Sequence, residues 1–321
     1  REGEHVKGFI PEVFWVTEAG DHKLEERYAM RPTSETAMYS MYALWIHGAR
    51  DLPLKMYQRC QVWRYETKAT KPFIRSREFH WIEAHDCFAT RDEAMAQVRQ
   101  DMEMAEQVIH GKFCVPFMFF RRPQWDKFAG AEDTYAADTL MPDRRALQLP
   151  STHMLGQHFS KAFGIKFTDD KGKDEYVWQT CYGPCISRIY AAVIAIHGDD
   201  RGLVLPVRLA PVQAVIVPIV RDETKEKVMQ RCREVANAIG CCFVTKIDDS
   251  DRTPGFKFNE WEMKGVPIRI EIGMRDVESD SVVVVRRDTG EKLKVKTSEL
   301  DAKLDEVAQS LDKNLRERAD K

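Results

Sequence analysis

Arginine, glutamate and aromatic residues alternate along residues 57–83. The pattern predicts two long antiparallel strands joined by a polar loop at residues 67–72. Successive side chains of a strand point to opposite faces, so alternate residues of each strand share a side. If the two strands align, one face of the hairpin carries Cys60, Val62, Arg64 and Glu66 from the first strand and Arg75, Arg77, Phe79, Trp81 and Glu83 from the second.

Such a face is a poor surface for a hydrophobic core and a good one for a ligand that bears phosphates, a ring and a cation. Guanidinium groups bind phosphate through paired hydrogen bonds, and aromatic rings stack on planar groups. The alternative is a solvated hairpin with ordinary surface ion pairs. Lys68 and Lys71 lie at the tip of the loop in either case.

A second group of candidates lies in residues 31–36, where Pro, Thr, Ser and Glu form a helix-entry signal. Thr33 and Glu35 then stand at a helix N-terminus, where backbone N–H groups are unpaired. The alternative is a simple capping role for Thr33 or Ser34. Helical spacing predicts one apolar stripe along the helix, formed by Met38, Met41, Tyr42 and Trp45.

Arg188 stands in the first turn of an apolar helix expected at residues 186–196, after a strand that runs into Gly183. A buried arginine is costly unless it is paired. A phosphate or a purine face would supply the partner, and the alternative is an acid elsewhere in the chain. For the lone His153, a hydrogen-bonded structural role is the alternative to a functional one.

The elements that position these residues fit a chain of two domains, as expected for 321 residues. A break in pattern places the boundary near residues 205–211, so we expect domains at 1–207 and 208–321. In the second, strands alternate with helices, which indicates a small α/β domain with a mixed sheet. The net charge of −2 means that contact with nucleic acid would depend on local patches.

The eight cysteines are scattered and form no disulfide framework, which favours a reducing compartment. No Cys-x-x-Cys pair occurs, so we expect no structural zinc within this chain. No apolar run approaches about 18 residues, so no membrane span is expected either. These features together favour a cytoplasmic location.

Taken in order, these segments resemble the class II aminoacyl-tRNA synthetases and, within them, the prolyl-tRNA synthetase family. Arg64 with Glu66 resembles the motif 2 arginine of the class, and Arg188 after Gly183 resembles that of motif 3. The prolyl branch is marked by residues 31–36, by Phe-Ile-Arg-Ser-Arg-Glu-Phe at 73–79, by His-Gly-Asp at 197–199, and by an anticodon-domain signature at 254–267. Four matches in the right order are more specific than any single motif.

The resemblance implies an α+β protein: a class II antiparallel sheet flanked by helices, followed by an α/β anticodon-binding domain with a mixed sheet. It implies activation of proline with ATP to prolyl-adenylate and transfer of the prolyl group to tRNA(Pro). Magnesium would accompany ATP without assigned protein ligands. A homodimer is the expected assembly.

The resemblance also implies roles for individual residues, with Arg64 and Arg188 as the catalytic pair. The ATP-binding set is Arg64, Glu66, Arg75, Phe79, Gln148, Ser151 and Arg188. The proline-binding set is Thr33, Glu35, Arg64, Phe79, Trp81 and His153. The tRNA-binding set is Lys68, Lys71, Phe256, Lys257 and Lys264. A solvated loop is the alternative for the first two lysines, and core packing is the alternative for Phe256 and Trp261.

The chain departs from the family pattern at several points. Cys185 stands where motif 3 usually has a second glycine, which would crowd the purine side of the pocket. The interval of about 100 residues between the hairpin and motif 3 leaves no room for a large editing insertion, so correction would fall to a separate editing protein. The resemblance further implies motif 1 before Arg1 and a zinc-binding extension after Lys321.

Two alternatives to a prolyl-tRNA synthetase stay open at this point. One is a catalytically silent synthetase-like protein that binds tRNA, although such proteins usually lose a catalytic arginine or the acid for the amino acid. The other is a different class II synthetase, such as the threonyl or glycyl enzyme. The Thr-Ser-Glu segment at 33–35 and the pair Phe79 and Trp81 argue against it.

Overall fold

The computed structural model describes residues 13–67 and 70–321. They form two compact units, which are described separately below. The first comprises the described residues as far as Glu106 together with Phe117–Ala192, and the second comprises Gln107–Pro116 and Val193–Lys321. The boundary expected between residues 207 and 208 stays a prediction. None of the described helices is long and apolar enough to cross a membrane.

The first unit is built on a six-stranded sheet in the order β3-β4-β10-β7-β6-β5. All neighbouring strands in this sheet are antiparallel. Two further hairpins, β1–β2 and β8–β9, lie outside it. The strands are β1 (Trp15–Ala19), β2 (His22–Ala29), β3 (Leu54–Trp63), β4 (Glu78–Phe88), β5 (Met118–Arg121), β6 (Asp133–Leu140), β7 (Ala146–Gly156), β8 (Lys166–Thr168), β9 (Asp174–Tyr176) and β10 (Trp178–Pro184).

Strands β3 and β4 form the hairpin expected at residues 57–83, with Cys60 opposite Trp81 and Val62 opposite Phe79. Opposite residues of an antiparallel pair lie on the same face, so the expected alignment of the two faces is confirmed for these four residues.

The prediction that the strands extend to Glu66 and begin again at Arg75 is wrong. Strand β3 ends at Trp63 and β4 begins at Glu78, so Arg64 and Glu66 lie in the segment that connects them. A backbone bond from Arg64 N to Arg77 O (2.9 Å) closes the base of that segment. Its turn is closed by a second bond, from Arg75 N to Lys71 O (2.9 Å), next to Pro72, which has no N–H to offer a ladder.

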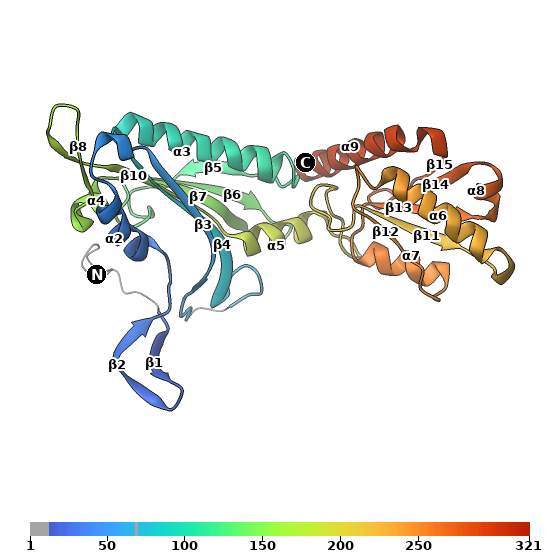
Figure 1. The fold of residues 1–321 in the computed structure, drawn as a ribbon, viewed down its shortest axis with the longest axis horizontal. Helices are drawn as coiled ribbons and strands as arrows, with labels where there is room; N and C mark the ends of the chain where they lie inside the picture. Colours follow the sequence, from blue (N-terminus) through green and yellow to red (C-terminus); the bar gives the residue numbers. More distant parts are fainter. Residues whose placement is uncertain (1–12, 68–69) are drawn as a thin grey trace. The chain divides into compact units, whose positions relative to one another are not determined.

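Three helices, a 3-10 turn and the first part of α5 complete the described part of the first unit, while the end of α5 and most of the π-helical turn after α3 belong to the second. Helix α3 contacts β4, β7 and β10 and so covers one face of the sheet (Figure 1). Its start is a capping box, in which Thr90 accepts from the Glu93 N–H and Glu93 accepts from the Thr90 N–H. The helical segments are α2 (Glu35–Trp45), a 3-10 turn (Ala49–Asp51), α3 (Arg91–Ala105), α4 (His158–Phe163) and α5 (Ile186–His197), while a π-helical turn (Glu106–His110) extends α3.

The expected stripe of helix α2 is partly wrong. Tyr42 is fully buried, but Met41 and Trp45 are exposed. The face that packs on the sheet instead carries Glu35 and Tyr39 with Tyr42. Spacing alone could not choose between two overlapping stripes, and the buried one includes a carboxylate.

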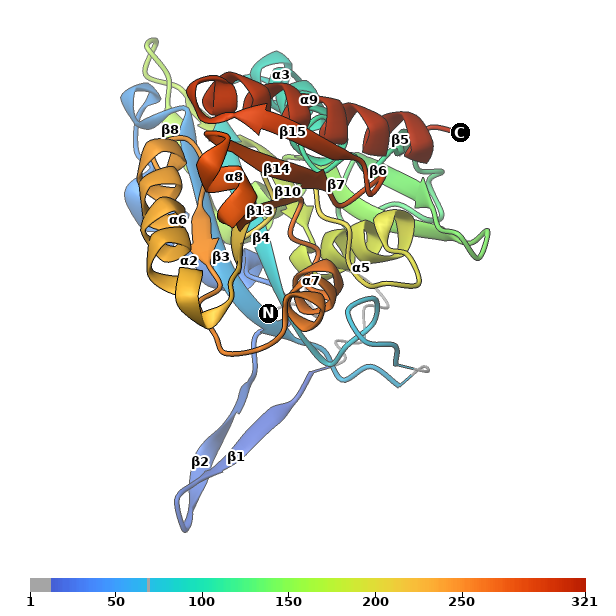
Figure 2. The ribbon, with the colours of Figure 1, turned by 90° about the vertical axis from the view of Figure 1, so that its right-hand side faces the viewer.

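The second unit contains a five-stranded sheet in the order β12-β11-β13-β14-β15. Strand β11 is parallel to β12 and β13, whereas β13, β14 and β15 are antiparallel to one another, and Figure 2 shows these last three side by side. The strands are β11 (Ala214–Ile219), β12 (Thr245–Ile247), β13 (Ile268–Gly273), β14 (Ser281–Arg286) and β15 (Lys292–Lys296). The helices are α6 (Lys225–Ile239), α7 (Pro254–Met263), α8 (Met274–Glu278) and α9 (Leu300–Ala319), with 3-10 turns at Asp222–Thr224 and Thr297–Glu299.

Alternation along β11 divides the second unit into two apolar layers. Ala214 and Ile216 join the core formed with α6 and α9, while Val215 and Val217 pack with Trp261 of α7 on the other face. A strand covered on both faces reads as a continuous apolar run, as this one does. The mixed sheet here and the antiparallel sheet of the first unit confirm the predicted fold class.

Candidate functional site

A cavity of about 320 Å³ lies in the first unit, over one face of the six-stranded sheet. Its walls come from the start of α2, the segment between β3 and β4, strands β4, β7 and β10, and the start of α5. Every residue predicted to bind ATP or proline lines it: Thr33, Glu35, Arg64, Glu66, Arg75, Phe79, Trp81, Gln148, Ser151, His153 and Arg188. The structure therefore brings together segments that are up to about 150 residues apart in the sequence.

Arg64 and Arg188 are bonded to backbone carbonyls. Arg64 Nε donates to Pro32 O (3.1 Å), and its guanidinium lies 5.4 Å from the Phe79 ring and 5.3 Å from the Trp81 ring. Arg188 Nε donates to Ile74 O (2.9 Å). In the part of the chain that the structure describes, neither guanidinium pairs with a carboxylate, and burial lowers the pKa of Arg64. Two oriented cations without anionic partners suit an anionic ligand.

Glu66 and Arg75 face each other across the outer part of the cavity, with Glu66 Oε1 3.1 Å from Arg75 Nη1. Both side chains keep some exposure, so this pair contributes little to stability. The ion pair can therefore break at a small cost in free energy, and both side chains can then contact a ligand.

Cys185 also lines the cavity, next to the backbone of Gly183. Its Sγ lies 3.3 Å from Ser187 Oγ, and its backbone forms an isolated bridge with Trp81. The thiol thus occupies part of the cavity wall beside the start of α5.

The inner end of the cavity is acidic and aromatic. The Thr33 hydroxyl donates to the Glu35 carboxylate, which is 6% exposed. Phe79 and Trp81 meet edge to face, with ring centroids 5.8 Å apart. A buried carboxylate beside two aromatic rings suits a ligand with a cation and an apolar body.

His153 is neutral. Burial lowers its pKa to about 3, and the positive charge of His85 acts in the same direction. Its Nδ1 lies 2.9 Å from Thr134 Oγ1 and its Nε2 lies 3.0 Å from Ser151 Oγ. With both ring nitrogens hydrogen-bonded, His153 can shape the cavity but is a poor candidate for an acid or a base.

The sequence reasoning missed three buried residues at the inner end: Glu83, His85 and Cys181. Glu83 was seen only as part of the hairpin. The available signal was alternation, because Glu83 and His85 continue the face of β4 that carries Phe79 and Trp81.

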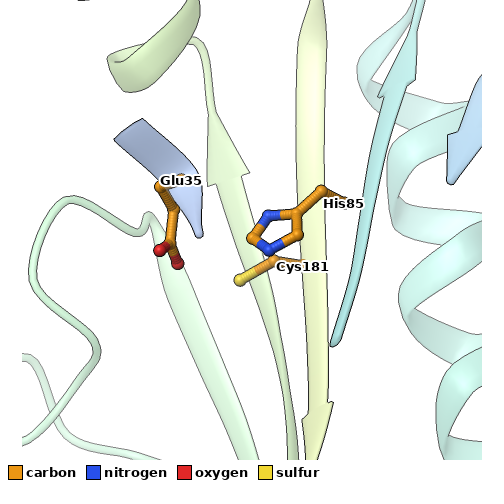
Figure 3. Close-up of side chains that lie close together, drawn as sticks. All are labelled: Glu35, His85 and Cys181. Carbon is orange, nitrogen blue, oxygen red and sulfur yellow. The ribbon is translucent and has the colours of Figure 1, made fainter. Parts of the chain in front are cut away.

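Glu35, His85 and Cys181 each place one potential metal ligand within 4.8 Å of the others, and Figure 3 shows them turned toward a common point. A metal site needs a thiolate and a free imidazole nitrogen. Burial raises the pKa of the Cys181 thiol far above its usual range. Both nitrogens of His85 are already engaged, by Tyr39 and Glu83. The cluster does not fit a metal ion, while Glu35 remains suited to an organic cation.

The residues predicted to contact tRNA lie in different surroundings. Lys68 is outside the described residues, and Lys71 is exposed in the turn between β3 and β4. Phe256 is 46% exposed and stacks under Arg252 (4.2 Å), so it is no core residue.

The position of Lys257 argues against its predicted RNA contact. The side chain is 3% exposed, and its Nζ donates to Asp248 O (2.8 Å). Lys264 is half-exposed and lies 4.6 Å from the Trp261 ring, with Glu260 as its ion-pair partner at 2.7 Å. Trp261 is buried, in keeping with the packing alternative.

Comparison with known proteins identifies both units. Residues 14–197 match the tRNA synthetase class II core domain (G, H, P, S and T), and residues 213–317 match an anticodon binding domain. The proline–tRNA ligase of Thermofilum pendens is 58% identical over 322 residues, covering 99% of this chain and 67% of that protein. The proline–tRNA ligase of Methanococcus maripaludis is 44% identical over 321 residues, covering 100% of this chain and 69% of that protein.

A solved structure gives the same result. The prolyl-tRNA synthetase of Cryptosporidium parvum, crystallised with halofuginone and AMPPNP, superimposes with a TM-score of 0.92 at 40% identity. The match covers 100% of this chain and 66% of that one, so this chain spans about two thirds of the length of its relatives. The conserved architecture, the arginine-lined cavity and these matches together place the chain in the prolyl-tRNA synthetase family of class II aminoacyl-tRNA synthetases, which are ligases.

Proposed function

We propose that this cavity activates proline with ATP and that the protein then transfers the prolyl group to tRNA(Pro). In the first step, a carboxylate oxygen of proline attacks the α-phosphorus of ATP in line with the leaving pyrophosphate. The products are prolyl-adenylate and pyrophosphate. We assign this step to a catalytic domain at residues 1–207 and the recognition of tRNA to an anticodon-binding domain at 208–321.

The observation that carries the proposal is the pair of arginines that face the cavity without a carboxylate partner. Arg64 is held by a backbone carbonyl and two aromatic rings, and Arg188 by backbone carbonyls, so their charge remains available to a ligand. Phosphoryl-type transfer needs positioning and compensation of charge more than acid–base groups. A planar guanidinium offers both, because it can bond two oxygens at once.

For the nucleotide, Arg64 would bridge the proline carboxylate and the α-phosphate, and Arg188 would bind the γ-phosphate. Arg75 would take an outer phosphate after leaving Glu66, which would then accept from the adenine amino group. Phe79 would stack on the adenine ring. The oxygens of Gln148 and Ser151 would line the nucleotide end.

For proline, the Glu35 carboxylate would receive the imino cation, and the Thr33 hydroxyl that now donates to it would keep its orientation. Trp81 and Phe79 would form the wall against the apolar ring. His153, neutral and held by two hydroxyls, would close the pocket as a shape element.

Magnesium would supply charge compensation for the triphosphate when bound. Its preferred ligands are oxygens, commonly one or two carboxylates together with phosphates. The carboxylates that line this cavity are engaged, Glu35 by Thr33, Glu66 by Arg75 and Glu83 by His85, while Asp126 lies 3.9 Å from Arg122. We therefore assign no protein ligand to the metal and expect it to enter with ATP.

Selectivity for proline would be incomplete, because one methylene in an apolar pocket is worth only about 1–3 kcal/mol. Alanine and cysteine would then be activated at a low rate, and a separate editing protein would clear the mischarged tRNA. Deacylation of alanyl-tRNA by the purified protein alone would argue against such a partner.

We propose that the protein forms a homodimer, which the exposed apolar side chains support. We also propose a reducing, cytoplasmic compartment, which the free thiols support. Helix α2 exposes Met41, Leu44 and Trp45, a set of large apolar side chains that a second subunit could cover. All eight cysteines are free.

The test is ATP–pyrophosphate exchange screened over the twenty amino acids. We expect exchange that depends on proline. Exchange with another amino acid alone would indicate a different class II synthetase. No exchange with any amino acid would indicate a silent tRNA-binding protein.

A further inference from the structure

Glu83 is a buried carboxylate, only 3% exposed, that faces four hydrogen-bond donors. Its Oε1 accepts from the Ser34 hydroxyl, from Gln58 Nε2 (2.8 Å) and from Cys60 Sγ (3.3 Å), and its Oε2 lies 3.1 Å from His85 Nε2. Burial by itself would raise the pKa of Glu83, but the bonds from His85, Ser34 and Cys60 outweigh it and lower the pKa to about 2. Glu83 is therefore ionised at neutral pH.

The four donors come from three different elements. Ser34 is the N-cap residue of α2, Gln58 and Cys60 belong to β3, and His85 belongs to β4. Gln58 Nε2 also donates to Ser34 Oγ (2.6 Å), which closes a ring of three side chains. One carboxylate thus ties the start of a helix to two strands.

Ser34 shows that this link serves more than the helix. A serine N-cap usually accepts from a backbone N–H of its own helix and so stabilises that helix. The Ser34 side chain makes no such bond and donates to Glu83 instead. The helix lacks the side-chain hydrogen bond that would cap it, and the bond to Glu83 fixes the position of its first turn instead.

The first turn of α2 carries Glu35, the residue after Ser34, with Thr33 on the other side. His85, the second partner of Glu83, lies close to Glu35 in the cluster of Figure 3. Tyr39 OH, one turn further along α2, lies 2.9 Å from His85 Nδ1. Two sets of contacts therefore connect Glu83 to the helix on either side of Glu35. One runs through Ser34, and the other runs through His85 and Tyr39.

We propose that Glu83 is a positioning residue for the amino acid: by holding Ser34 and His85, it fixes the Glu35 carboxylate where the imino cation of the substrate arrives. This inference rests on the proposed function. Its role would be indirect, because the side chain is 3% exposed and bonded to Ser34, Gln58, Cys60 and His85. Stability alone does not account for its charge, because an apolar group of similar size is often as stable at a buried position.

The test is steady-state ATP–pyrophosphate exchange by the full-length protein with Glu83→Gln, which keeps the shape and removes the charge. We expect the KM for proline to rise about tenfold, since a hydrogen bond to a charged group is lost on each side. The KM for ATP should stay within about twofold, because Arg64, Arg188 and Glu66 make no bond to Glu83.

Asp86→Asn is the matched control, since Asp86 is a buried carboxylate on the same strand and lies near Asp101 of α3. It should leave both KM values unchanged. An equal change in both KM values with Glu83→Gln, or the same effect from Asp86→Asn, would overturn the inference. If the wild-type protein shows no proline-dependent exchange, the proposed function fails and the inference falls with it.

A second pair of variants decides the matter if Glu83→Gln does not fold. Ser34→Ala breaks the link to α2 alone and should raise the KM for proline about three- to tenfold. Ser40→Ala, on the same helix but bonded to the Thr36 carbonyl, is its control and should have no effect. Equal KM values for these two variants would show that the link does not position Glu35.

Discussion

The two sheets of this protein bury charge in opposite ways. In the first unit, the cavity face of the six-stranded sheet carries Glu83 and His85, and it meets Arg64 and Arg188, which are hydrogen-bonded to backbone carbonyls. In the second unit, both faces of β11 are aliphatic, and the buried arginines Arg269, Arg286 and Arg287 are each paired with a carboxylate. Arg287, for example, forms two bonds with Asp199 (2.8 and 2.7 Å).

The difference separates charge that stabilises a fold from charge that binds a ligand. The charge of a buried arginine is compensated when the arginine is paired with a carboxylate, and removing either partner leaves an uncompensated charge. An arginine held by carbonyl oxygens is oriented, but its charge is not neutralised. The charge is compensated only when an anionic ligand binds. The number of buried charges would not have distinguished the two units, whereas their partners do.

The largest effect should come from Arg64→Ala. Loss of the guanidinium that bridges two anions should lower proline-dependent exchange by about 10³-fold or more, comparable to the loss of a principal charge-stabilising group elsewhere. Stability should change little or increase, because desolvation of Arg64 now opposes folding. Exchange kinetics and thermal melting measure the two effects separately.

Retention of exchange within about tenfold by Arg64→Ala would contradict the assignment of this residue. Arg64→Lys sharpens the test, since it keeps the charge and loses the planar fork. It should also be strongly impaired, because one ammonium cannot bond two anions in the same geometry.

Arg287→Ala should lower the stability of the fold and leave proline-dependent exchange unchanged, the reverse of Arg64→Ala. Arg287 is buried, and its loss leaves Asp199, whose pKa the arginine holds well below its usual range. Since Asp199 is itself about one-third exposed, water would offset part of the loss, and we expect destabilisation by about 2–3 kcal/mol. Denaturant titration would measure it. Exchange per folded molecule should be unchanged, and a specific loss of exchange would break the distinction between the two units.

The candidate cavity was predictable from the sequence because its signals are local. Strand alternation placed Phe79 with Trp81, and the helix-entry signal placed Thr33 with Glu35. Each pattern predicts a face. The face of the hairpin is confirmed where its strands exist, whereas the apolar stripe predicted for α2 is wrong at Met41 and Trp45. Arg64 and Arg75 reached the cavity although they lie outside the strands, because the connecting segment folds over the same face.

The remainder depended on contacts between distant segments. Ser34 and Glu83 are 49 residues apart, and nothing at either position announces the bond. Helical spacing could not show that Met41 and Trp45 are exposed, because burial is decided by the sheet that the helix meets. The burial of Lys257 could not be predicted either, because its partner Asp248 lies outside the helix that carries the lysine.

Asp86→Asn tests a buried carboxylate on the face of β4 opposite to the one that carries Glu83 and His85. Burial and the nearby Asp101 raise the pKa of Asp86 to about 6, above its ordinary value. An acid with a higher pKa in the folded state binds its proton more tightly there, so the folded protein loses stability as pH rises from about 4 through 6. The variant removes that loss.

We therefore expect Asp86→Asn to be more stable than the wild type by about 1–2 kcal/mol at pH 8 and equal to it at pH 4, the gain being reduced by the amide hydrogens that the asparagine buries. Denaturant midpoints across this range would show it. A stability difference that does not vary with pH would mean that Asp86 does not titrate as described.

The smallest effect should come from Lys71→Ala, which tests whether the turn between β3 and β4 guides tRNA. Lys71 is exposed and its backbone, through the bonds with Arg75, holds the turn, so the side chain can be removed without changing the cavity. Loss of one phosphate contact should raise the KM for tRNA about two- to fivefold and leave pyrophosphate exchange intact. Lys171→Ala, in the turn between β8 and β9, is the control and should change neither. Loss of both activities in Lys71→Ala would place this lysine in the catalytic cavity rather than on the path of the RNA.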